Sequence, residues 1–421
     1  MRPSQRRNGL YWVSFALILS CCGTPPHVPE PEPESVDLRS VLEESVEADL
    51  IAGAVGLIAV DGEVVFREAV GWKDIHGEEP MAEDTIFRIA SMTKPITSAA
   101  VMMLIEEGRL HLDDPVSQFI SEFQGLEVVV LGSNGDRPFA PTRGEITVRH
   151  LLTHTAGISY RFSGVEPLTS LYSEAGISDG LSQTDGTIGQ GMRRLATLPL
   201  LHEPGTAWKY GLSTDVLGYL IEIVSQRTLE QFFRERIFEP LGMKDTYFFL
   251  PEEKVSRLAS VYRPVRDGLR ELTDEPIQEG PVIFSTSYHY RGPRTYFSGG
   301  AGLVSTVDDY FRFCQMILNG GELEGVRLLK SETVDLMTTN QIDDLSVGEG
   351  KFGFGFSIET RGGRPAWGWG GFFFTRFWID PREEVVGIFM SQLWPNQRSP
   401  VDEAFRSVAN EWIRANQTTA Q

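Results

Sequence analysis

Apolar residues follow two different spacings in the first part of the chain. Over Val36–Leu50 they recur at the spacing of one helix face. Two apolar runs come next, over Gly53–Val60 and Glu63–Trp72, and Asp61-Gly62 stands between them. Because this dipeptide is favoured in tight hairpin turns, the pattern predicts a helix followed by a β-hairpin.

A second group of apolar runs lies near the C-terminus. These runs predict four consecutive antiparallel strands and a closing amphipathic helix, over Phe352–Glu359, Arg364–Trp369, Phe372–Asp380, Glu384–Ser391 and Val401–Ala415. Strands are therefore expected at both ends of the chain.

The middle of the chain has mainly helical spacing. Helices are predicted over Ile96–Glu107, Thr147–His154, Met192–Leu198, Thr214–Gln226, Leu229–Phe238 and Thr306–Leu318, with Ser213 as an N-cap. Residues 158–190 show no clear periodicity, and residues 250–297 are irregular and polar, which favours a lid or rim of a site. Together the runs predict an α+β fold. A central antiparallel sheet is built from both chain ends and flanked by helices, with a mostly helical inserted domain and a cleft beside it.

The first 36 residues have the composition of an export signal and a tether. A basic start with Arg2, Arg6 and Arg7 precedes the apolar run Leu10–Ser20, which is too short to span a bilayer comfortably. Residues 1–20 therefore resemble a bacterial lipoprotein signal, with Cys21 as the lipidated residue and Cys22 as the alternative. Residues 21–36 are rich in Pro and Glu and predict an extended tether. The folded domain is expected over residues 37–415 and a tail over residues 416–421, in a protein exported to the cell envelope and anchored to a membrane.

Net charge limits the possible partners, and cysteine content limits the possible disulfides. The formal net charge is −20, which argues against nucleic acid and against anionic membrane surfaces as partners. Of the 3 cysteines only Cys314 lies outside the signal region, so no disulfide framework is expected. Its place on the apolar face of a predicted helix indicates a core thiol.

One candidate for nucleophilic chemistry lies where an apolar segment enters a helix. Ser91 is followed by Lys94, and the apolar run Ile96–Glu107 begins directly afterwards. Residues three apart on a helix share a face, so Ser91 Oγ and Lys94 Nζ should converge at the helix N-terminus, near free N–H groups. A lysine among apolar residues loses proton affinity and can serve as a base.

Two later motifs offer complementary groups. In Trp208-Lys209-Tyr210, a tyrosine precedes a predicted helix and can relay protons. In Trp367–Phe372, glycines on a predicted edge strand permit close approach of a ligand, to which the backbone can lend one N–H.

These motifs, in this order, resemble the serine β-lactamase-like family, which includes class C β-lactamases, penicillin-binding carboxypeptidases and family VIII carboxylesterases. The resemblance extends over residues 45–415 and includes Phe87–Lys94, Arg149–Gly157, Glu203–Tyr210, Asp215–Gly218, Pro240–Met243 and Gly299–Leu303. It implies Ser91 as nucleophile, Lys94 and Tyr210 as an acid/base pair, and the N–H groups of Ser91 and Phe372 as an oxyanion hole. It implies neither a metal nor an organic cofactor.

Two departures from the class C pattern indicate an ester as substrate. Tyr210-Gly211-Leu212 lacks the Asn of a Tyr-x-Asn motif, and Trp369-Gly370-Gly371 begins with Trp where a lactamase has Lys. The missing groups recognise the amide and carboxylate of a β-lactam, and each such contact is worth about 1.5–3 kcal/mol. Family VIII esterases share the aromatic Trp-Gly-Gly motif, so Trp369, Gly370 and Gly371 are expected to bind a small-molecule ester or amide.

Several alternatives remain open at this point. The enzyme alternatives are a β-lactamase or D-stereospecific peptidase, or acyl transfer to an acceptor other than water. The alternative of another class is an inert module that binds cell-wall fragments. Gly176–Gly180 matches the G-x-S-x-G nucleophile motif, but it lies in a polar loop without the required strand. His150 and His154 have a spacing that permits metal binding, although a structural pair near the site is favoured.

Overall fold

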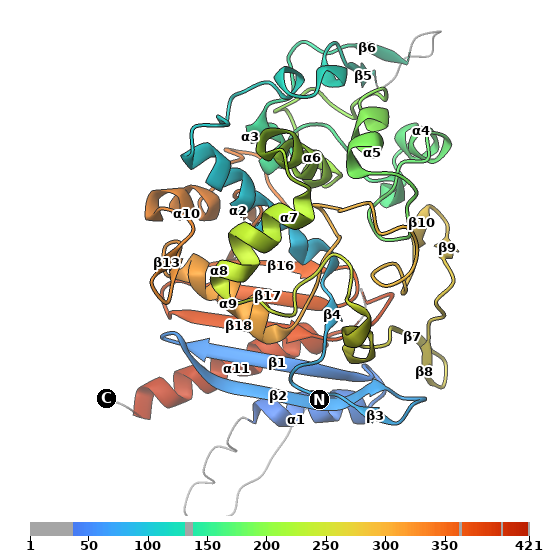
Figure 1. The fold of residues 1–421 in the computed structure, drawn as a ribbon. Helices are drawn as coiled ribbons and strands as arrows, with labels where there is room; N and C mark the ends of the chain where they lie inside the picture. Colours follow the sequence, from blue (N-terminus) through green and yellow to red (C-terminus); the bar gives the residue numbers. More distant parts are fainter. Residues whose placement is uncertain (1–36, 131–137, 362–363, 397–398, 420–421) are drawn as a thin grey trace, which may run out of the picture. The chain divides into compact units, whose positions relative to one another are not determined.

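One antiparallel sheet carries strands from both ends of the chain in the computed structural model (Figure 1). The strand order is β14-β15-β16-β17-β18-β1-β2-β3, and β1 (Gly53–Val60) pairs with both β18 (Val385–Met390) and β2 (Glu63–Asp74). The structure describes residues 37–130, 138–361, 364–396 and 399–419. The predicted α+β fold with a sheet built from both chain ends is confirmed.

The N-terminal hairpin follows directly from its sequence. Asp61 and Gly62 have φ angles of 52° and 80°, the two positive values that a type I′ turn requires. Seven of the eight β1 residues are buried because both faces of this central strand are covered. The predicted hairpin is therefore confirmed, including its turn.

Two of the predicted C-terminal strands differ by several residues from the strands of the structure. The remaining strands of the sheet are β3 (Glu79–Pro80), β14 (Lys351–Phe352), β15 (Ser357–Arg361), β16 (Arg364–Gly371) and β17 (Thr375–Asp380). The run predicted as one strand over Phe352–Glu359 is divided between β14 and β15, because the chain turns at Gly355 with a φ of 89°. The strand predicted over Phe372–Asp380 begins only at Thr375, so Phe372 lies in the turn before it.

Helices cover both faces of the sheet (Figure 1). On one face, α1 (Leu38–Glu47) and α11 (Val401–Thr419) share a core with Trp378 and Phe389 of the sheet. On the other face, α9 (Val307–Leu318) lies against β1 and β18. The closing helix was predicted to end at Ala415, but it extends to Thr419.

The helical region lies between the two groups of strands in the sequence. Its elements are α2 (Thr93–Glu106), α3 (Val148–Leu152), α4 (Leu168–Glu174), α5 (Ile188–Leu195), α6 (Ser213–Ser225), α7 (Leu229–Phe233), a π-helical turn (Arg234–Phe238), α8 (Glu239–Leu241) and α10 (Ser331–Thr338). Residues 158–190 contain α4, which the sequence pattern did not predict, because only Leu168 and Tyr172 of this short helix are buried. Ser213 is the first helical residue of α6 rather than its N-cap, which is Leu212.

The remaining strands form two-stranded pairs outside the main sheet. They are β4 (Phe87–Arg88) with β11 (Val304–Ser305), β5 (Glu127–Val129) with β6 (Phe139–Pro141), β7 (Tyr262–Val265) with β8 (Gly268–Glu271), β9 (Ile277–Glu279) with β10 (Val282–Phe284), and β12 (Glu322–Leu323) with β13 (Val326–Arg327). Residues 250–297, predicted to be irregular, thus contain two hairpins. Arg88 of β4 is buried and lies shortly before α2. Its guanidinium donates to the carbonyl oxygens of Ala259 and Thr286 and so connects this segment to the start of α2.

The predictions for the N-terminal segment lie outside the described residues. They are the signal at residues 1–20, lipidation at Cys21 or Cys22, and the tether over residues 21–36. Within the part of the chain that the structure describes, no helix combines the length and the hydrophobicity needed to cross a membrane.

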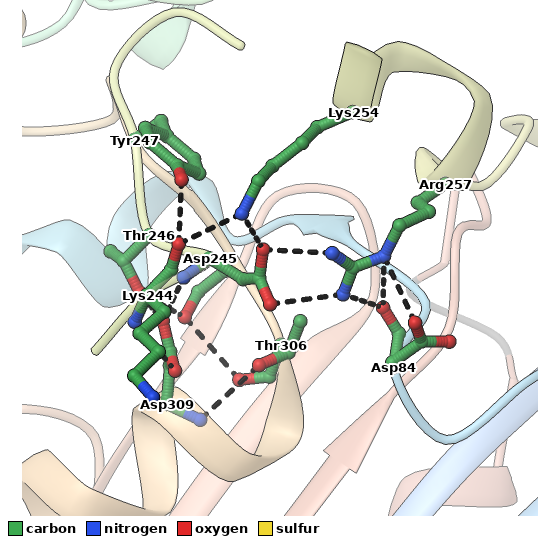
Figure 2. A network of polar contacts seen from close by, with 10 residues as sticks. Asp84, Lys244, Asp245, Thr246, Tyr247, Lys254, Arg257, Thr306 and Asp309 are labelled. Atoms are coloured by element: carbon green, nitrogen blue, oxygen red, sulfur yellow. Dashed lines mark hydrogen bonds and ion pairs between the residues drawn. The ribbon is translucent and has the colours of Figure 1, made fainter. Parts of the chain in front are cut away.

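A network of hydrogen bonds and ion pairs connects the start of α9 to the segment over residues 244–257 (Figure 2). Buried Asp309 accepts hydrogen bonds from the backbone N–H groups of Lys244 and Asp245, at 3.1 and 2.7 Å, and from Thr246 Oγ1 at 2.8 Å. Asp245 in turn pairs with Arg257 at 2.8 Å. The network joins parts of the chain far apart in sequence, so it is expected to stabilise the fold.

We expect Asp309→Ala to lower the free energy of unfolding by about 2–4 kcal/mol, because the buried Thr246 hydroxyl and two partly buried backbone N–H groups would lose their acceptor. Urea denaturation measures this loss. Asp308→Ala is the matched control, since Asp308 is exposed and forms only a surface ion pair with Arg67. The control should lose less than about 1 kcal/mol. Equal losses in the two variants would contradict a stabilising role for the network.

Candidate active site

The candidate nucleophile lies in a tight turn ahead of α2. Ser91 is the middle residue of a 3-10 turn over Ala90–Met92, and α2 begins directly after it at Thr93. The preceding residue, Ala90, is fully buried and has a φ of 40°, a conformation that a non-glycine residue rarely adopts. Packing around Ala90 thus holds a strained backbone that fixes the direction of Ser91, as is common at functional sites.

Lys94 reaches back from the first turn of α2 to the serine. Its Nζ donates hydrogen bonds to Ser91 Oγ at 3.3 Å and to the carbonyl oxygen of Gly300 at 2.7 Å. The side chain is only 1% exposed, and no carboxylate of the described residues lies within 4.0 Å of Nζ. The helix starts at Thr93 instead of the predicted Ile96, which places Lys94 inside it and on the same side as Ser91.

Tyr210 approaches the same oxygen from the loop before α6. Its OH donates to Ser91 Oγ at 2.7 Å, and Trp369 Nε1 donates to the tyrosine oxygen at 3.3 Å. Lys94 Nζ lies 4.6 Å from the centre of the Tyr210 ring. The structure thus brings together Ser91, Lys94 and Tyr210, as expected from the sequence, and adds a contact between Trp369 and Tyr210 that was not predicted.

An aromatic cluster supports Tyr210 from behind. The rings of Trp208, Tyr160 and His154 lie 6.1, 5.2 and 5.0 Å from the Tyr210 ring. Burial, and secondarily the positive charge of Lys94, hold the pKa of His154 well below its usual value, so this histidine is neutral. His150, its predicted partner, instead accepts a hydrogen bond from the backbone N–H of Thr147 in a helix cap.

The end of β16 lies against the nucleophile turn. A side chain at Gly371 would place its Cβ 2.5 Å from the carbonyl oxygen of Ile89, so only glycine permits this approach. Strand pairing ends with Gly371 opposite Thr375, and Phe372 follows as the first residue of the turn. Phe372 and Ser91 both line the same cavity.

The strand that carries Trp369 was predicted to be an edge strand, but it lies inside the sheet. β16 lies between β15 and β17. However, its pairing with β15 ends at Gly368, whereas its pairing with β17 continues to Gly371. Trp369, Gly370 and Gly371 therefore form a local edge at the mouth of the site, because β15 is too short to cover them.

A cavity of about 610 Å³ opens over these residues. Near Ser91 its wall is aromatic, with Phe162, Tyr210, Trp369 and Phe372. Its lining also has a polar part with the charged side chains of Glu359, Arg376 and Arg406. Val347 and residues 349–351 line it as well, whereas the predicted rim over residues 250–297 contributes no lining residue.

The other candidate groups lie apart from this constellation or are inert. Ser178 of the G-x-S-x-G match is hydrogen-bonded to Thr184 in a loop that follows α4. A helix therefore stands where a nucleophile elbow needs a strand. Cys314 is a buried free thiol whose pKa is raised well above its usual value by burial, which confirms its interpretation as a core residue.

Sequence reasoning missed the residues that hold Lys94 in place. The Gly300 carbonyl accepts its strongest hydrogen bond, and Tyr160 places its ring centre 5.5 Å from Nζ. The only signal for Gly300 was its position in the motif Gly299–Leu303, to which no role was assigned. A backbone carbonyl leaves no mark in the residue type, so only the fold reveals it.

We expect Gly371→Ala to reduce kcat by at least about 10-fold, because the added methyl group would push β16 away from Ile89 and misplace the groups around Ser91. Steady-state kinetics with a chromogenic ester measures this effect. Gly370→Ala is the matched control, since the nearest atom to its new Cβ would be 3.5 Å away. Equal losses in both variants would show that the close approach at Gly371 is unimportant.

Sequence comparisons with known proteins match most of the chain. A sequence model of the family described as Beta-lactamase matches residues 38–411. Esterase EstB of Burkholderia gladioli is 34% identical over 342 residues, which cover 79% of this chain and 78% of the esterase. Protein Rv1367c of Mycobacterium tuberculosis is 32% identical over 380 residues, which cover 85% of this chain and 90% of that protein.

Comparison with solved structures agrees with the sequence comparisons. The solved structure of EstCE1, described as a hydrolase with promiscuous acyltransferase activity, matches with a TM-score of 0.76 at 28% identity. The match covers 88% of this chain and 97% of EstCE1. The similarity therefore extends over most of both chains.

Proposed function

The chain belongs to the β-lactamase family, as a hydrolase or acyl-transfer enzyme similar to family VIII esterases, and from this premise we propose that it is a serine hydrolase that cleaves carboxylic esters. One observation carries the proposal: Lys94 Nζ and Tyr210 OH both direct a hydrogen bond at Ser91 Oγ, at 3.3 and 2.7 Å. A serine oxygen with two proton-carrying partners is the arrangement that nucleophilic catalysis needs.

In the proposed reaction Ser91 Oγ attacks the ester carbonyl carbon and its proton passes to the Lys94/Tyr210 pair. The oxyanion of the tetrahedral intermediate accepts hydrogen bonds from the backbone N–H groups of Ser91 and Phe372. The carbon–oxygen bond to the alcohol then breaks, and Tyr210 returns a proton to the leaving oxygen. Water attacks the resulting acyl-enzyme in the same way and releases the acid.

The lining of the cavity favours an ester over a β-lactam. The position of the lactamase Asn is occupied by Leu212, which is fully buried in the core, and the position of the lactamase Lys by Trp369. At the polar end Arg376 is already paired with Asp402 at 2.8 Å, and Arg406 with Glu359 at 2.9 Å. A substrate carboxylate would have to displace one of these acids. We therefore propose neutral esters with an apolar group beside Trp369 and Phe372 as the substrates.

Acyl transfer to an alcohol is the second candidate function. EstCE1 supports it by its described activity, and the acyl-enzyme step is common to both reactions. The two differ only in whether water or another alcohol enters the cavity after the first product leaves. A β-lactamase or D-stereospecific peptidase, and an inert module that binds cell-wall fragments, remain as weaker alternatives.

The test is a substrate panel with a covalent probe, applied to residues 35–421. We expect one equivalent of a fluorophosphonate to add to Ser91, as detected by peptide mass spectrometry, and p-nitrophenyl butyrate to be hydrolysed faster than nitrocefin. Faster nitrocefin turnover would favour the lactamase alternative. Absence of labelling and of turnover would overturn the hydrolase proposal. Product analysis with added alcohol separates transfer from hydrolysis.

We also propose that the protein is exported and held to a membrane by a lipid on Cys21. The basic start, the short apolar run over residues 10–20 and the cysteine that follows it support this proposal. Labelled palmitate should enter the full-length protein expressed in a bacterium, and Cys21→Ala should prevent this. Incorporation that is lost only in Cys22→Ala would move the anchor by one residue, and no incorporation would overturn the anchor.

A further inference from the structure

Two strained backbone segments carry the N–H groups of the proposed oxyanion hole. Ser91 follows Ala90, which has a φ of 40°, and Phe372 begins the turn that contains Phe374, whose φ is 73°. Ala90 and Phe374 are both buried, and neither is a glycine. Such backbone conformations persist only where the surrounding structure holds them, so each segment depends on contacts outside itself.

The chain that follows β18 holds the turn. The backbone N–H groups of Ser391 and Leu393 donate to two carbonyl oxygens of the turn, at 3.1 and 3.0 Å. Within the part of the chain that the structure describes, no backbone hydrogen bond joins residues 87–92 directly to residues 371–375. The residue between the two donors is Gln392, so the place of its side chain is fixed relative to the turn.

The side-chain amide of Gln392 bonds to the segment that carries the nucleophile. Its Oε1 accepts from the backbone N–H of Arg88 at 3.1 Å and from the Arg88 guanidinium at 3.2 Å. Its Nε2 donates to the carbonyl oxygens of Ser391 at 2.7 Å, Arg88 at 3.3 Å and Phe373 at 3.4 Å. Because Oε1 faces only donors and Nε2 only acceptors, the orientation of the amide is determined. The side chain is only 4% exposed, so water does not compete for these bonds.

The Arg88 end of this connection is itself held in place. The buried guanidinium donates to the carbonyl oxygens of Thr286 at 2.7 Å and Ala259 at 2.6 Å. Burial lowers the pKa of Arg88 to about 10, which leaves the group charged at neutral pH. Gln392 therefore bonds to a fixed partner on one side and to a fixed turn on the other.

We propose that Gln392 is a positioning residue that sets the separation of the two oxyanion N–H groups, those of Ser91 and Phe372. The inference rests on the proposed function. Among the side chains that the structure describes, Gln392 is the one that hydrogen-bonds to both segments. Arg88 lies three residues before Ser91, and Phe373 directly follows Phe372. Both N–H groups must reach the same oxygen, so loss of this connection slows the reaction without removing a reacting group.

The first test uses Gln392→Met, which approximately keeps the volume of the side chain and removes its hydrogen bonds. We expect kcat for p-nitrophenyl butyrate, per active site titrated with a fluorophosphonate, to fall by at least about 10-fold. Removing an oxyanion donor outright costs about 10²–10³-fold, and a displaced donor costs part of that. KM should stay within about 3-fold of the wild type, because acylation and deacylation both pass through an oxyanion and slow together.

The affinity for n-butylboronic acid gives a second readout. Boron bonds to Ser91 Oγ and becomes a tetrahedral anion, in which one oxygen takes the place of the oxyanion. The inhibition constant should therefore rise in Gln392→Met by about the same factor as kcat falls. A loss of substrate binding alone would not produce this agreement.

A second variant and a control complete the test. Gln392→Asn keeps a buried amide but is one carbon shorter, so it cannot bond to both backbone groups of Arg88. It should show the same two effects, and it keeps the proposal testable if Gln392→Met does not fold. Gln315→Met is the matched control, because Gln315 is also a buried glutamine and its Nε2 donates to Asn319 at the end of α9, at 2.7 Å. Its kcat per active site should stay within about 2-fold of the wild type.

A purely structural role for Gln392 predicts a different result. The melting temperature and the fraction of active sites would fall, while kcat per active site and boronic acid affinity stay at the wild-type values, and this outcome would overturn the proposal. A fall in kcat per active site with unchanged boronic acid affinity would place the defect outside the oxyanion hole and would overturn it too, as would an equal loss in Gln315→Met. A wild-type protein that neither labels nor hydrolyses the ester overturns the proposed function and, with it, this inference.

Discussion

Ser91→Ala is expected to abolish ester hydrolysis and fluorophosphonate labelling together, with kcat/KM falling by at least about 10⁴-fold. Lys94 and Tyr210 converge on Ser91 Oγ, at 3.3 and 2.7 Å, so both proton carriers lose their common partner when this oxygen is removed. Without Oγ the acyl-enzyme bond cannot form. Steady-state kinetics and the intact mass of the probe-treated protein measure the two effects.

Ser178→Ala is the matched control for this variant. Ser178 belongs to the G-x-S-x-G match, and its Oγ contacts Thr184 Oγ1 at 2.8 Å. Turnover and labelling should remain within about 2-fold of the wild type, since the hydrogen bonds of Ser178 join it to Thr184 and Gly180 rather than to a residue of the candidate site. If Ser178→Ala removed labelling and Ser91→Ala retained it, the nucleophile would be assigned to the wrong segment. Melting temperatures of both variants exclude unfolding as the cause.

The sheet could be predicted from the sequence because its signals are local. The hairpin turn at Asp61-Gly62 needs two positive φ angles, and this dipeptide supplies them. The run that became β18 is short and continuously apolar, and the runs that became β16 and β17 each contain two aromatic residues, which is typical of buried strands. That strands from both chain ends join in one sheet was inferred from the rule that a sheet must bury its faces, whereas the order of the strands was not predicted.

Elements whose structure depends on distant neighbours were predicted poorly. Helix α4 was missed because it buries only Leu168 and Tyr172, so its sequence resembles a loop. The edge character of β16 was assigned to the whole strand, whereas it arises only where β15 ends, at Gly368. The contribution of residues 349–351 to the cavity lining was missed because nothing in those residues identifies the surface that they face.

The candidate site, like the fold, was predicted well where the signal is local and poorly where it depends on distant residues. Ser91 and Lys94 are three residues apart, so a helical turn is enough to predict that they meet. Tyr210 lies 119 residues from Ser91 and was placed beside it only by resemblance to a family. Gly300 stood in a quoted motif without a role, because its contact with Lys94 is made by the backbone carbonyl, which the residue type does not reveal.

Tyr210 is the second residue on which the chemistry depends most. Its oxygen is hydrogen-bonded both to Ser91 Oγ at 2.7 Å and to Trp369 Nε1 at 3.3 Å. The indole donor holds the oxygen in place, and Lys94 Nζ lies 4.6 Å from the ring centre. These contacts keep the tyrosine oxygen against Ser91 Oγ, where the proposed proton transfer takes place.

Tyr210→Phe is therefore expected to lower kcat/KM by at least about 10²-fold, since it removes the proton carrier and leaves the ring packing intact. Tyr160→Phe is the matched control, because Tyr160 is also aromatic and places its ring centre 5.5 Å from Lys94 Nζ, while its hydroxyl interacts with Tyr210 rather than with the nucleophile. The control should lose no more than about 10-fold. Kinetics with an ester of a good leaving group and one of a poor leaving group separates the two proton transfers. The loss in Tyr210→Phe should be greater for the poor leaving group, whose oxygen depends on the returned proton. A larger loss in Tyr160→Phe than in Tyr210→Phe would transfer the proton-carrying role to Tyr160.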